Sequence, residues 1–502
     1  MIFTNISNIT DKTNKAFFVE KVLLYTRIIE CLSGKLLSEY AAISEIQDEI
    51  INELKNIGVI LNAEELPLLR KTLTPNVYSR FIHAVEEFVI SPKFYLPWVT
   101  KLRNSSREEC IADVPQNAPT IADFFCGAGG MSMGFCKAGF NVLLANDIVD
   151  ECIETYRFNH PEIPTENVVK ADIRELCEYV DKYISKSVDI VVGGPPCQGF
   201  SSANQQRIIN DPRNELYKYF LKAIESIAPK FVVMENVKGM LSVADQVVED
   251  YGNIKVMVNG TEQHYIVSCQ LVNSADFGVA QNRIRLIYIA IRSDIAAEKD
   301  LSPQKIFDKI AEEKQEKPFV LKSALEFIKP LSSPRIKGLT EVDDELTGKK
   351  VDANTFKSTN KYIELINSNK KVPLVFNHKA RYANDTNFQI FSLLKQGEDA
   401  SSERIKGIMP YSHRLHCFKD KYFRLYEDRP CRTITAHLRM DCLSHIHPTQ
   451  TRTITPREAA RVQSFPDDYV FLGAYLKTYM QIGNAVPVLL ANKIANVIKQ
   501  YI

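Results

Sequence analysis

Between Thr120 and about residue 300, short apolar runs alternate with segments of helical periodicity. Runs of this length fit buried strands, and strands that alternate with helices form a parallel sheet with helices on both faces. The sequence therefore predicts an α/β domain, with ligands expected at the carboxyl ends of its strands. The predicted strands are Thr120–Phe125, Asn141–Ala145, Val188–Val192, Phe231–Met234 and Arg285–Ile291.

The alternation occupies only the middle of the 502-residue chain. Apolar residues recur at helical spacing through Phe17–Cys31 and Ile43–Ile57, and Gly58 suits the end of the second helix. Arg103–Pro119 is polar, contains two prolines and is expected to be a linker. We therefore expect three parts: a helical extension at 1–112, the α/β domain at 113–300 completed by 476–502, and a smaller mixed domain at 301–475.

Two further helices are predicted near the end of the chain. Thr455–Gln463 has a threonine suited to the N-cap and Pro456 at the first helical position. We expect this helix to organise the smaller domain rather than to take part in chemistry. Pro487–Ile502 is the second, in the segment that completes the α/β domain.

Charge is unevenly distributed, although the net charge is only +1. Residues 301–450 hold 26 Lys and Arg against 19 Asp and Glu, together with six of the nine His. Such an excess can bind nucleic-acid phosphates, and a solvated surface is the alternative.

No apolar run approaches the roughly 18 residues of a membrane span, and no secretory signal is visible. The eleven Cys form no C-x-x-C pair, which fits free thiols in a cytoplasmic protein better than disulfides or a metal site.

The first candidate site is the glycine-rich segment Asp123–Gly130 (DFFCGAGG), where the first predicted strand ends. Its glycines let the backbone turn sharply and approach a ligand closely. Ser132 stands where the dinucleotide fingerprint needs its third glycine, so a cofactor other than NAD is favoured. Asp147 closes the next strand and can accept hydrogen bonds from a ribose diol, while Asp172 suits an adenine amino group. A plain tight turn and two helix N-caps are the alternative.

Three further motifs lie at the ends of predicted strands. Gly193–Ser201 (GGPPCQGFS) leaves Cys197 at the apex of a rigid loop, where a nucleophile is more expected than a buried structural thiol. Glu235 follows the strand Phe231–Met234 directly. Arg283 and Arg285 alternate in an extended segment and should point to the same side. A nucleophile, a carboxylate and guanidinium groups at neighbouring strand ends are hard to explain structurally.

Together these motifs resemble the cytosine-5 DNA methyltransferases of prokaryotic restriction–modification systems. The resemblance runs from about Thr120 to the C-terminus and is interrupted between roughly 300 and 420. It rests on the glycine-rich segment, Pro195–Ser201, Glu235–Val237, Gln281–Arg285, Arg452–Tyr469 and Gln481–Pro487. It implies a Rossmann-like methyltransferase domain that uses S-adenosylmethionine and no metal, a target-recognition domain in the 301–475 region, and a bacterial cytoplasmic location.

The chemistry follows from the target atom. Carbon 5 of cytosine is a poor nucleophile, and addition of a Cys197 thiolate to carbon 6 would make it nucleophilic. Glu235 is suited to neutralise the charge on the ring. Arg285 can fix the base through its carbonyl, and Arg283 can hold a backbone phosphate.

The resemblance also implies the cofactor contacts. The methionine and adenosine parts would lie along the glycine-rich segment, the ribose on Asp147, and the adenine beside Asp172 and Ile173. Asn484 and Val486 would close the pocket. The full set of implied cofactor residues is Phe125, Gly127, Gly129, Gly130, Asp147, Asp172, Ile173, Asn484 and Val486.

The implied partner is double-stranded DNA, with a cognate restriction endonuclease as a possible companion. A cysteine cannot reach carbon 6 inside a stacked duplex, so the base must be flipped out. The polar loop Ser201–Asn214 is suited to close behind it, with Gln205, Gln206 and Arg207 as candidates to fill the gap. Sequence choice is expected in residues 301–450, whose tail Arg424–His447 resembles a bacterial target-recognition framework.

Several alternatives stay open at this point. A cytosine-5 RNA methyltransferase of the eukaryotic tRNA-methylating branch shares the architecture, but that branch typically lacks the equivalent of Gly199. It also uses a Cys-Phe-Thr tripeptide, where this chain has only Cys417-Phe418-Lys419. A catalytically inactive DNA-binding protein and a small-molecule methyltransferase are the other readings. Residues 1–112 could be an interaction module, a helix-turn-helix regulator or a stabilising cap, and no recognition helix stands out.

Overall fold

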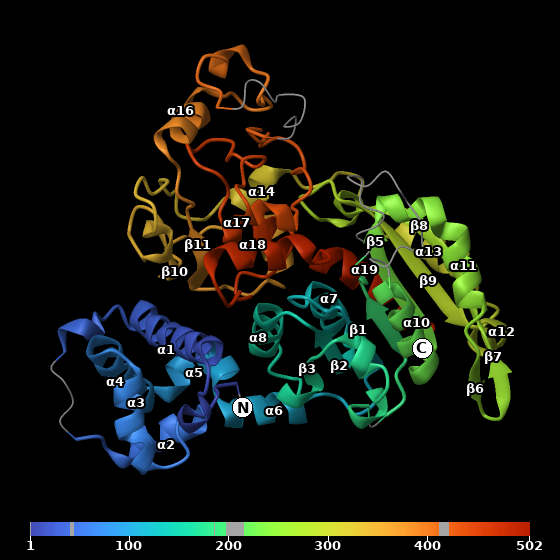
Figure 1. The fold of residues 1–502 in the computed structure, drawn as a ribbon, viewed down its shortest axis with the longest axis horizontal. Coiled ribbons are helices and arrows are strands. Elements are labelled where there is room, and N and C mark those ends of the chain that lie inside the picture. The colour runs from blue at the N-terminus through green and yellow to red at the C-terminus, as the bar shows by residue number, and fades with distance from the viewer. Residues whose placement is uncertain (1, 41–44, 185, 197–214, 411–420) are drawn as a thin grey trace.

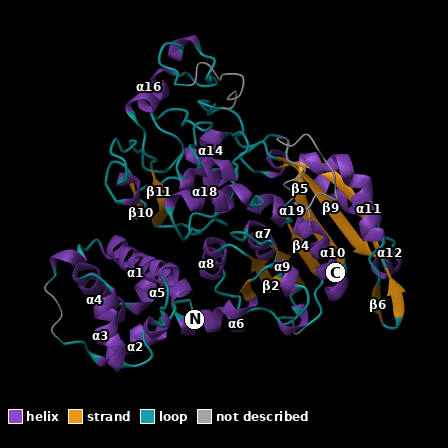
Figure 2. Ribbon diagram, in the orientation of Figure 1, coloured by secondary structure: helices purple, strands orange, loops and turns teal. Residues whose placement is uncertain are grey.

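The computed structural model describes residues 2–40, 45–184, 186–196, 215–410 and 421–502. The chain forms a helical N-terminal domain, an α/β domain and a loop-rich region that stands above both in Figure 1. Figure 2 shows the contrast, with helices throughout the first part and mostly loops in the third. Within the described residues, no helix is both long and apolar enough to cross a bilayer.

The N-terminal domain begins with a long helix whose ends are set by local chemistry. The Asp11 carboxylate accepts a hydrogen bond from the Asn14 amide at 2.8 Å, and Gly34 ends the helix with a φ of 70°. Gly58 likewise follows the second helix with a positive φ, as predicted. The helices are α1 (Lys12–Ser33), α2 (Asp48–Asn56), α3 (Leu66–Thr72), α4 (Pro75–Ile90), α5 (Pro92–Val99) and α6 (Asn104–Ala112).

The expected linker Arg103–Pro119 is wrong in its first half, because α6 occupies it. Its two arginines make tertiary contacts, whereas Glu108 and Glu109 face solvent. Arg103 pairs with Glu53 at 2.9 Å, and the buried Arg107 donates to the His160 carbonyl at 3.3 Å. These contacts stabilise a helix that composition alone does not predict.

The central sheet has the strand order β3-β2-β1-β4-β5-β9-β8. The first five strands pair in parallel, as predicted, whereas β9 pairs antiparallel with both β5 and β8. The expectation of a wholly parallel sheet is therefore wrong at this edge, because β8 and β9 are joined without the crossover helix that parallel strands need. The strands are β1 (Thr120–Phe124), β2 (Asn141–Asp147), β3 (Val168–Lys170), β4 (Ile190–Gly193), β5 (Phe231–Val237), β8 (Tyr265–Asn273) and β9 (Ile284–Arg292), and a separate hairpin contains β6 (Val256–Val258) and β7 (Thr261–Gln263).

Helices cover both faces of the sheet and form two apolar cores. One face packs on α7 (Gly130–Lys137), α8 (Asp150–Asn159), α13 (Pro303–Glu312) and α19 (Val488–Lys499). The other packs on α9 (Ile173–Leu176), α10 (Glu215–Ile227) and α11 (Ala244–Gly252), while α12 (Ser293–Glu298) follows β9. Since α13 shares the core of the sheet, we propose that the α/β domain extends through Glu312, beyond the boundary expected at residue 300.

The loop-rich region is organised around α17 (Pro456–Val462). Thr455 and Glu458 form a reciprocal capping box at its start, which confirms the predicted N-cap and first-turn proline. The buried Arg452 and Glu458 pair at 2.6 Å, so the helix is held by charge as well as by packing. The other elements are α14 (Leu321–Leu325), β10 (Gly348–Ala353), α15 (Lys361–Ile366), β11 (Leu374–Lys379), α16 (Asp385–Leu393) and α18 (Tyr475–Asn484).

Candidate active site at the carboxyl edge of the sheet

The glycine-rich segment turns sharply between β1 and α7. Phe125, Gly127 and Gly129 all have positive φ, of 56°, 53° and 81°. Gly130 begins α7 directly against the chain at 485–486, where an added Cβ would overlap the Val486 carbonyl and lie 3.0 Å from Ala485 Cβ. Glycine therefore lets a segment far away in the sequence close over this loop, and Val486 comes to lie beside it.

Asp147 at the end of β2 is tied to the same loop. Its Oδ2 accepts from the Gly127 amide and its Oδ1 from the Val149 amide, both at 2.9 Å. Burial raises the pKa of this carboxyl above its ordinary value. Each oxygen keeps a further lone pair that can accept a hydroxyl proton. The next residue, Ile148, is 60% exposed and forms an apolar surface at this edge that no sequence motif predicts.

Asp172 lies at the end of the neighbouring strand but is already engaged. It caps α9 by accepting from the Arg174 amide at 2.9 Å, and its Oδ2 pairs with Arg174 Nη2 at 2.6 Å. Hydrogen bonding from Arg174 lowers the pKa of Asp172. An adenine amino group would therefore compete with Arg174 for this carboxylate. Ile173 beside it is buried, and Asn484 is exposed at the end of α18.

Behind the glycine-rich segment, buried aromatic groups support its shape. The His160 ring stacks on Tyr156 at 4.5 Å, and the Tyr469 hydroxyl donates to the Ala128 carbonyl. Cys136, His160 and Glu162 form a group with ligand atoms within 4.8 Å of one another. His160 Nδ1 is already bonded to Glu162 at 2.8 Å, so we interpret the group as packing support.

Glu235 and the two predicted arginines meet at the ends of β5 and β9. Glu235 Oε1 lies 3.0 Å from Arg285 Nε and 3.9 Å from Arg283 Nη2, so both arginines point to one side as predicted. Arg283 is only 2% exposed and donates to the carbonyls of Ile434 and Gly483 at 2.9 and 3.2 Å. The expected phosphate contact of Arg283 does not fit this burial, and the residue instead joins three segments of the chain.

The chain that leads toward Cys197 is anchored beside this carboxylate. The Asn236 side-chain amide donates to the Pro195 carbonyl at 3.0 Å. An added Cβ on Gly194 would lie 3.6 Å from Glu235 Oε2. Cys197 itself and the loop Ser201–Asn214, with the three candidates Gln205, Gln206 and Arg207, lie outside the described residues.

Comparison with known proteins identifies the family of this chain. Residues 120–500 match the family model described as C-5 cytosine-specific DNA methylase. The chain belongs to the C-5 cytosine-specific DNA methylase family. It is therefore a DNA methyltransferase that acts on carbon 5 of cytosine, as the resemblance implied.

Individual relatives agree with this assignment. The Type II methyltransferase M1.HphI of Haemophilus parahaemolyticus is 32% identical, over 76% of this chain and 86% of that one. M.DdeI of Desulfomicrobium norvegicum is 33% identical, over 76% and 88%. A crystal structure of an E. coli prophage protein described as a DNA modification methyltransferase covers 76% of this chain and 99% of its own. Its TM-score of 0.57 at 23% identity supports the fold alone.

In this methylase, the loop-rich region is bonded directly to the carboxyl edge of the sheet. The Gln281 side chain donates to Gln463 at 2.8 Å and accepts from the Ile434 amide at 2.7 Å. Thr433 donates its hydroxyl proton to the Asn282 carbonyl at 2.8 Å. Gln281 belongs to the motif Gln281–Arg285, but the sequence alone predicts no role for it. Its position two residues before Arg283 was the one indication of a role, because its hydrogen-bond partners Gln463 and Ile434 lie far away in the sequence.

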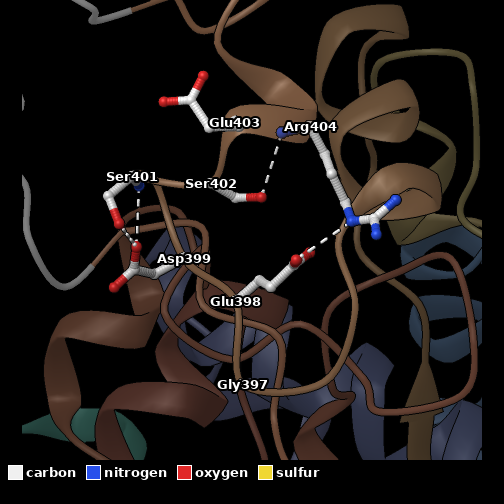
Figure 3. A pocket seen from close by; sticks show the side chains of 7 residues that line it. All are labelled: Gly397, Glu398, Asp399, Ser401, Ser402, Glu403 and Arg404. Carbon is white, nitrogen blue, oxygen red and sulfur yellow. Dashed lines mark hydrogen bonds and ion pairs between the residues drawn. The ribbon is translucent and has the colours of Figure 1, made fainter.

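A hollow in the loop-rich region lies apart from the carboxyl edge of the sheet. Glu398 pairs with Arg404 at 3.2 Å, and Asp399 accepts from the Ser401 hydroxyl at 2.6 Å (Figure 3). Three of its lining residues are acidic and one is basic, so the hollow is poorly suited to a phosphate. Its lining is Gly397, Glu398, Asp399, Ser401, Ser402, Glu403 and Arg404.

Proposed function

We propose that this methylase modifies a cytosine within one short duplex DNA sequence, using S-adenosylmethionine, as the modification enzyme of a bacterial restriction–modification system. The observation that carries the proposal is the contact of Glu235 with Arg285 beside the anchored Gly194–Pro195 segment. The Type II relatives support the restriction–modification context. A cognate endonuclease that cuts the same unmethylated sequence is the expected companion.

The carboxyl edge suits the cofactor chemically. S-adenosylmethionine supplies an activated methyl group when it is bound. The glycine-rich segment offers close backbone approach to it, from Phe125 through Gly127 and Gly129 to Gly130. Asp147 would accept hydrogen bonds from the ribose hydroxyls, and Asp172 and Ile173 would flank the adenine. Asn484 and Val486 would close the pocket from the C-terminal segment. We assign no metal to the reaction.

The chain's own residues activate the base. The Cys197 thiolate forms a bond to carbon 6 of the flipped cytosine, and the displaced electron pair moves into the ring toward nitrogen 3 and carbon 5. Glu235 donates a proton to nitrogen 3 and so neutralises the charge; its Oε1 faces the arginines, which leaves Oε2 for the base. Arg285 donates to the base carbonyl. Once carbon 5 carries its methyl group, a water molecule takes the carbon 5 proton, the electrons of that bond restore the ring double bond and expel the thiolate, and nitrogen 3 returns its proton to Glu235.

We propose that the loop-rich region sets specificity, and we call it the recognition region. It carries the basic excess of residues 301–450, which suits contacts with phosphates. Its bonds from Thr433 and Ile434 to the catalytic motif would keep base reading in register with the flipped cytosine. Exchanging this region for that of a relative should therefore change the methylated sequence.

Bisulfite sequencing of a methylation-free bacterial host tests the proposal. Cells that express the protein should contain 5-methylcytosine at one short recurrent sequence, and cells with Cys197→Ser should not. DNA carrying these marks should resist an endonuclease of the same specificity. Unmethylated DNA from cells with well-expressed, folded protein would overturn the proposal. Methylcytosine in the host tRNA of the same cells would then favour the RNA-modifying alternative.

A further inference from the structure

The N-terminal helices share one apolar core with both other parts of the molecule. Their buried side chains pack together with Phe158 of α8, on the catalytic side. The same core contains Val351 of β10 and Phe376 of β11 in the recognition region. Figure 1 shows α1 lying beneath this hairpin, and contacts of α1 with both strands agree. The domain is therefore packed into the enzyme rather than attached by a flexible tether.

Two adjacent residues of α1 bind opposite parts of the enzyme. Glu20 pairs with Lys350 of β10, and its two carboxylate oxygens accept from the Gly473 amide at 3.0 and 2.9 Å. Lys21 donates to Glu154 of α8 at 2.5 Å and has a side chain only 3% exposed. One turn of helix thus links the recognition hairpin to the catalytic domain.

A second link lies at the other end of the domain. Lys101 donates to the Asp468 carbonyl at 2.8 Å and to the Asn159 side chain at 3.3 Å. Asn159 is in turn bonded to the backbone of Val470 at 2.6 and 2.9 Å. The segment 468–473 leads into α18, whose end carries Gly483 and Asn484 at the catalytic edge. Both links therefore hold residues 468–473, which connect the recognition region with the catalytic domain.

The charge of the domain argues against a direct role in DNA binding. Residues 1–112 hold 13 Lys and Arg against 14 Asp and Glu, without the basic excess of the recognition region. Residues 1–119 also lie outside the family match, so the catalytic motifs do not include them. The domain instead makes an extended contact with the catalytic domain and with the recognition region. The relative position of these two parts decides how DNA is held.

We propose that the N-terminal domain is a brace that fixes the β10–β11 hairpin and residues 468–473 against α8, with Glu20 and Lys21 as positioning residues. This inference rests on the proposed function, because its consequence is DNA engagement. Loosening the brace should weaken the productive placement of duplex DNA without changing the chemistry at Glu235 or the binding of the cofactor. Deleting the domain would expose the shared core, so point variants are the suitable test.

The test uses the full chain and a duplex carrying the sequence mapped by bisulfite sequencing. Glu20→Gln keeps an acceptor for Gly473 but removes the charge opposite Lys350, and Lys21→Met keeps the packing but removes the charge opposite Glu154. Each should raise KM for DNA about tenfold, with kcat and the Kd for S-adenosylmethionine within about twofold of wild type. Glu64→Gln, on an exposed residue of the same domain, is the matched control and should change none of these values.

Lys350→Met removes the positive charge from the same contact with Glu20, on the side of the recognition region. Combined with Glu20→Gln, it should raise KM by less than the product of the two single effects. Amide hydrogen exchange in β10 should also be faster in Glu20→Gln than in Glu64→Gln. Wild-type KM in all three brace variants, or a loss confined to kcat, would overturn the proposal. An inactive wild type would instead count against the proposed function, and the exchange measurement would still test the brace.

Discussion

Glu235 Oε1 lies 3.0 Å from Arg285 Nε across the antiparallel strands β5 and β9. This contact leaves Oε2 available to the base, and Glu235→Gln keeps the shape of the side chain but cannot transfer a proton. We expect kcat to fall by about 100-fold or more, while the Kd for duplex DNA stays close to wild type. Single-turnover methyl transfer measures the change. Glu249→Gln, on the exposed face of α11, is the control; a variant at position 235 with near-normal turnover would contradict the proton-donor role.

Substitutions of the two neighbouring arginines should have different effects, one on stability and the other on catalysis. Arg283 is buried and donates to the carbonyls of Ile434 and Gly483, so Arg283→Lys should lower the free energy of unfolding by about 2 kcal/mol or more. Arg285 is more exposed and faces the carboxylate, so Arg285→Lys should lower kcat with little change in Tm. Thermal unfolding and steady-state kinetics on both variants provide the comparison. Equal effects of the two changes on Tm would remove the distinction.

Asp147 should control cofactor affinity and not DNA affinity. Its carboxylate is held by the amides of Gly127 and Val149, with lone pairs left for hydroxyl donors. Asp147→Ala should raise the Kd for S-adenosylmethionine about tenfold to 100-fold, the effect of losing hydrogen bonds to a charged group. Isothermal titration calorimetry measures it. Asp150→Asn changes an exposed carboxylate close by in the chain, which pairs with Lys170, and should leave the Kd unaltered.

Asp123 should make the α/β domain less stable as the pH rises. Burial raises the pKa of this carboxyl from 3.8 to about 7. Between these values the unfolded chain loses the proton while the folded chain keeps it. Stability therefore falls from about pH 4 to about pH 7, by roughly 4 kcal/mol in total. Asp123→Asn should raise Tm at pH 8 and have little effect at pH 4. A Tm difference between variant and wild type that is independent of pH would contradict the raised pKa.

The sequence was informative where a pattern is local. The apolar runs predicted β1, β2, β4, β5 and β9, because strands that are buried on both faces of a sheet are continuously apolar. They missed β3, which has only three residues, and β8, whose apolar residues are interrupted by Ser268 and Gln270. The direction of β9 also escaped prediction, because apolar content is the same in either orientation. The family motifs drew attention to Glu235, Arg283 and Arg285, whose chemistry follows from residue type.

The rest of the site depends on contacts between distant segments. Arg283 was expected to hold a phosphate because arginine often does, and only the fold reveals that carbonyls of Ile434 and Gly483 surround it. Glu20 and Lys21 carry no signal in the sequence, since an acid next to a base is ordinary on a helix. Their roles come from Lys350 and Glu154, more than a hundred residues away.

Arg381 should govern how the proposed recognition region contacts DNA. Its guanidinium donates to three successive carbonyls, those of Leu438, Arg439 and Met440, at 3.0, 3.2 and 2.6 Å. These carbonyls end a short turn, Ala436–Arg439, that packs against α18 beside the catalytic edge. The side chains of Arg439 and Met440 are exposed on it.

Because a lysine cannot hold three carbonyls in one plane, Arg381→Lys should loosen this turn. We expect KM for duplex DNA to rise about fivefold to tenfold and methylation to spread to near-cognate sequences, while the Kd for S-adenosylmethionine is unchanged. Bisulfite sequencing of a randomised duplex library measures the spread directly. Arg404→Lys, an exposed arginine paired with Glu398 in the same region, is the matched control. A library profile for Arg381→Lys that is identical to that of Arg404→Lys would mean that the turn keeps its shape without Arg381.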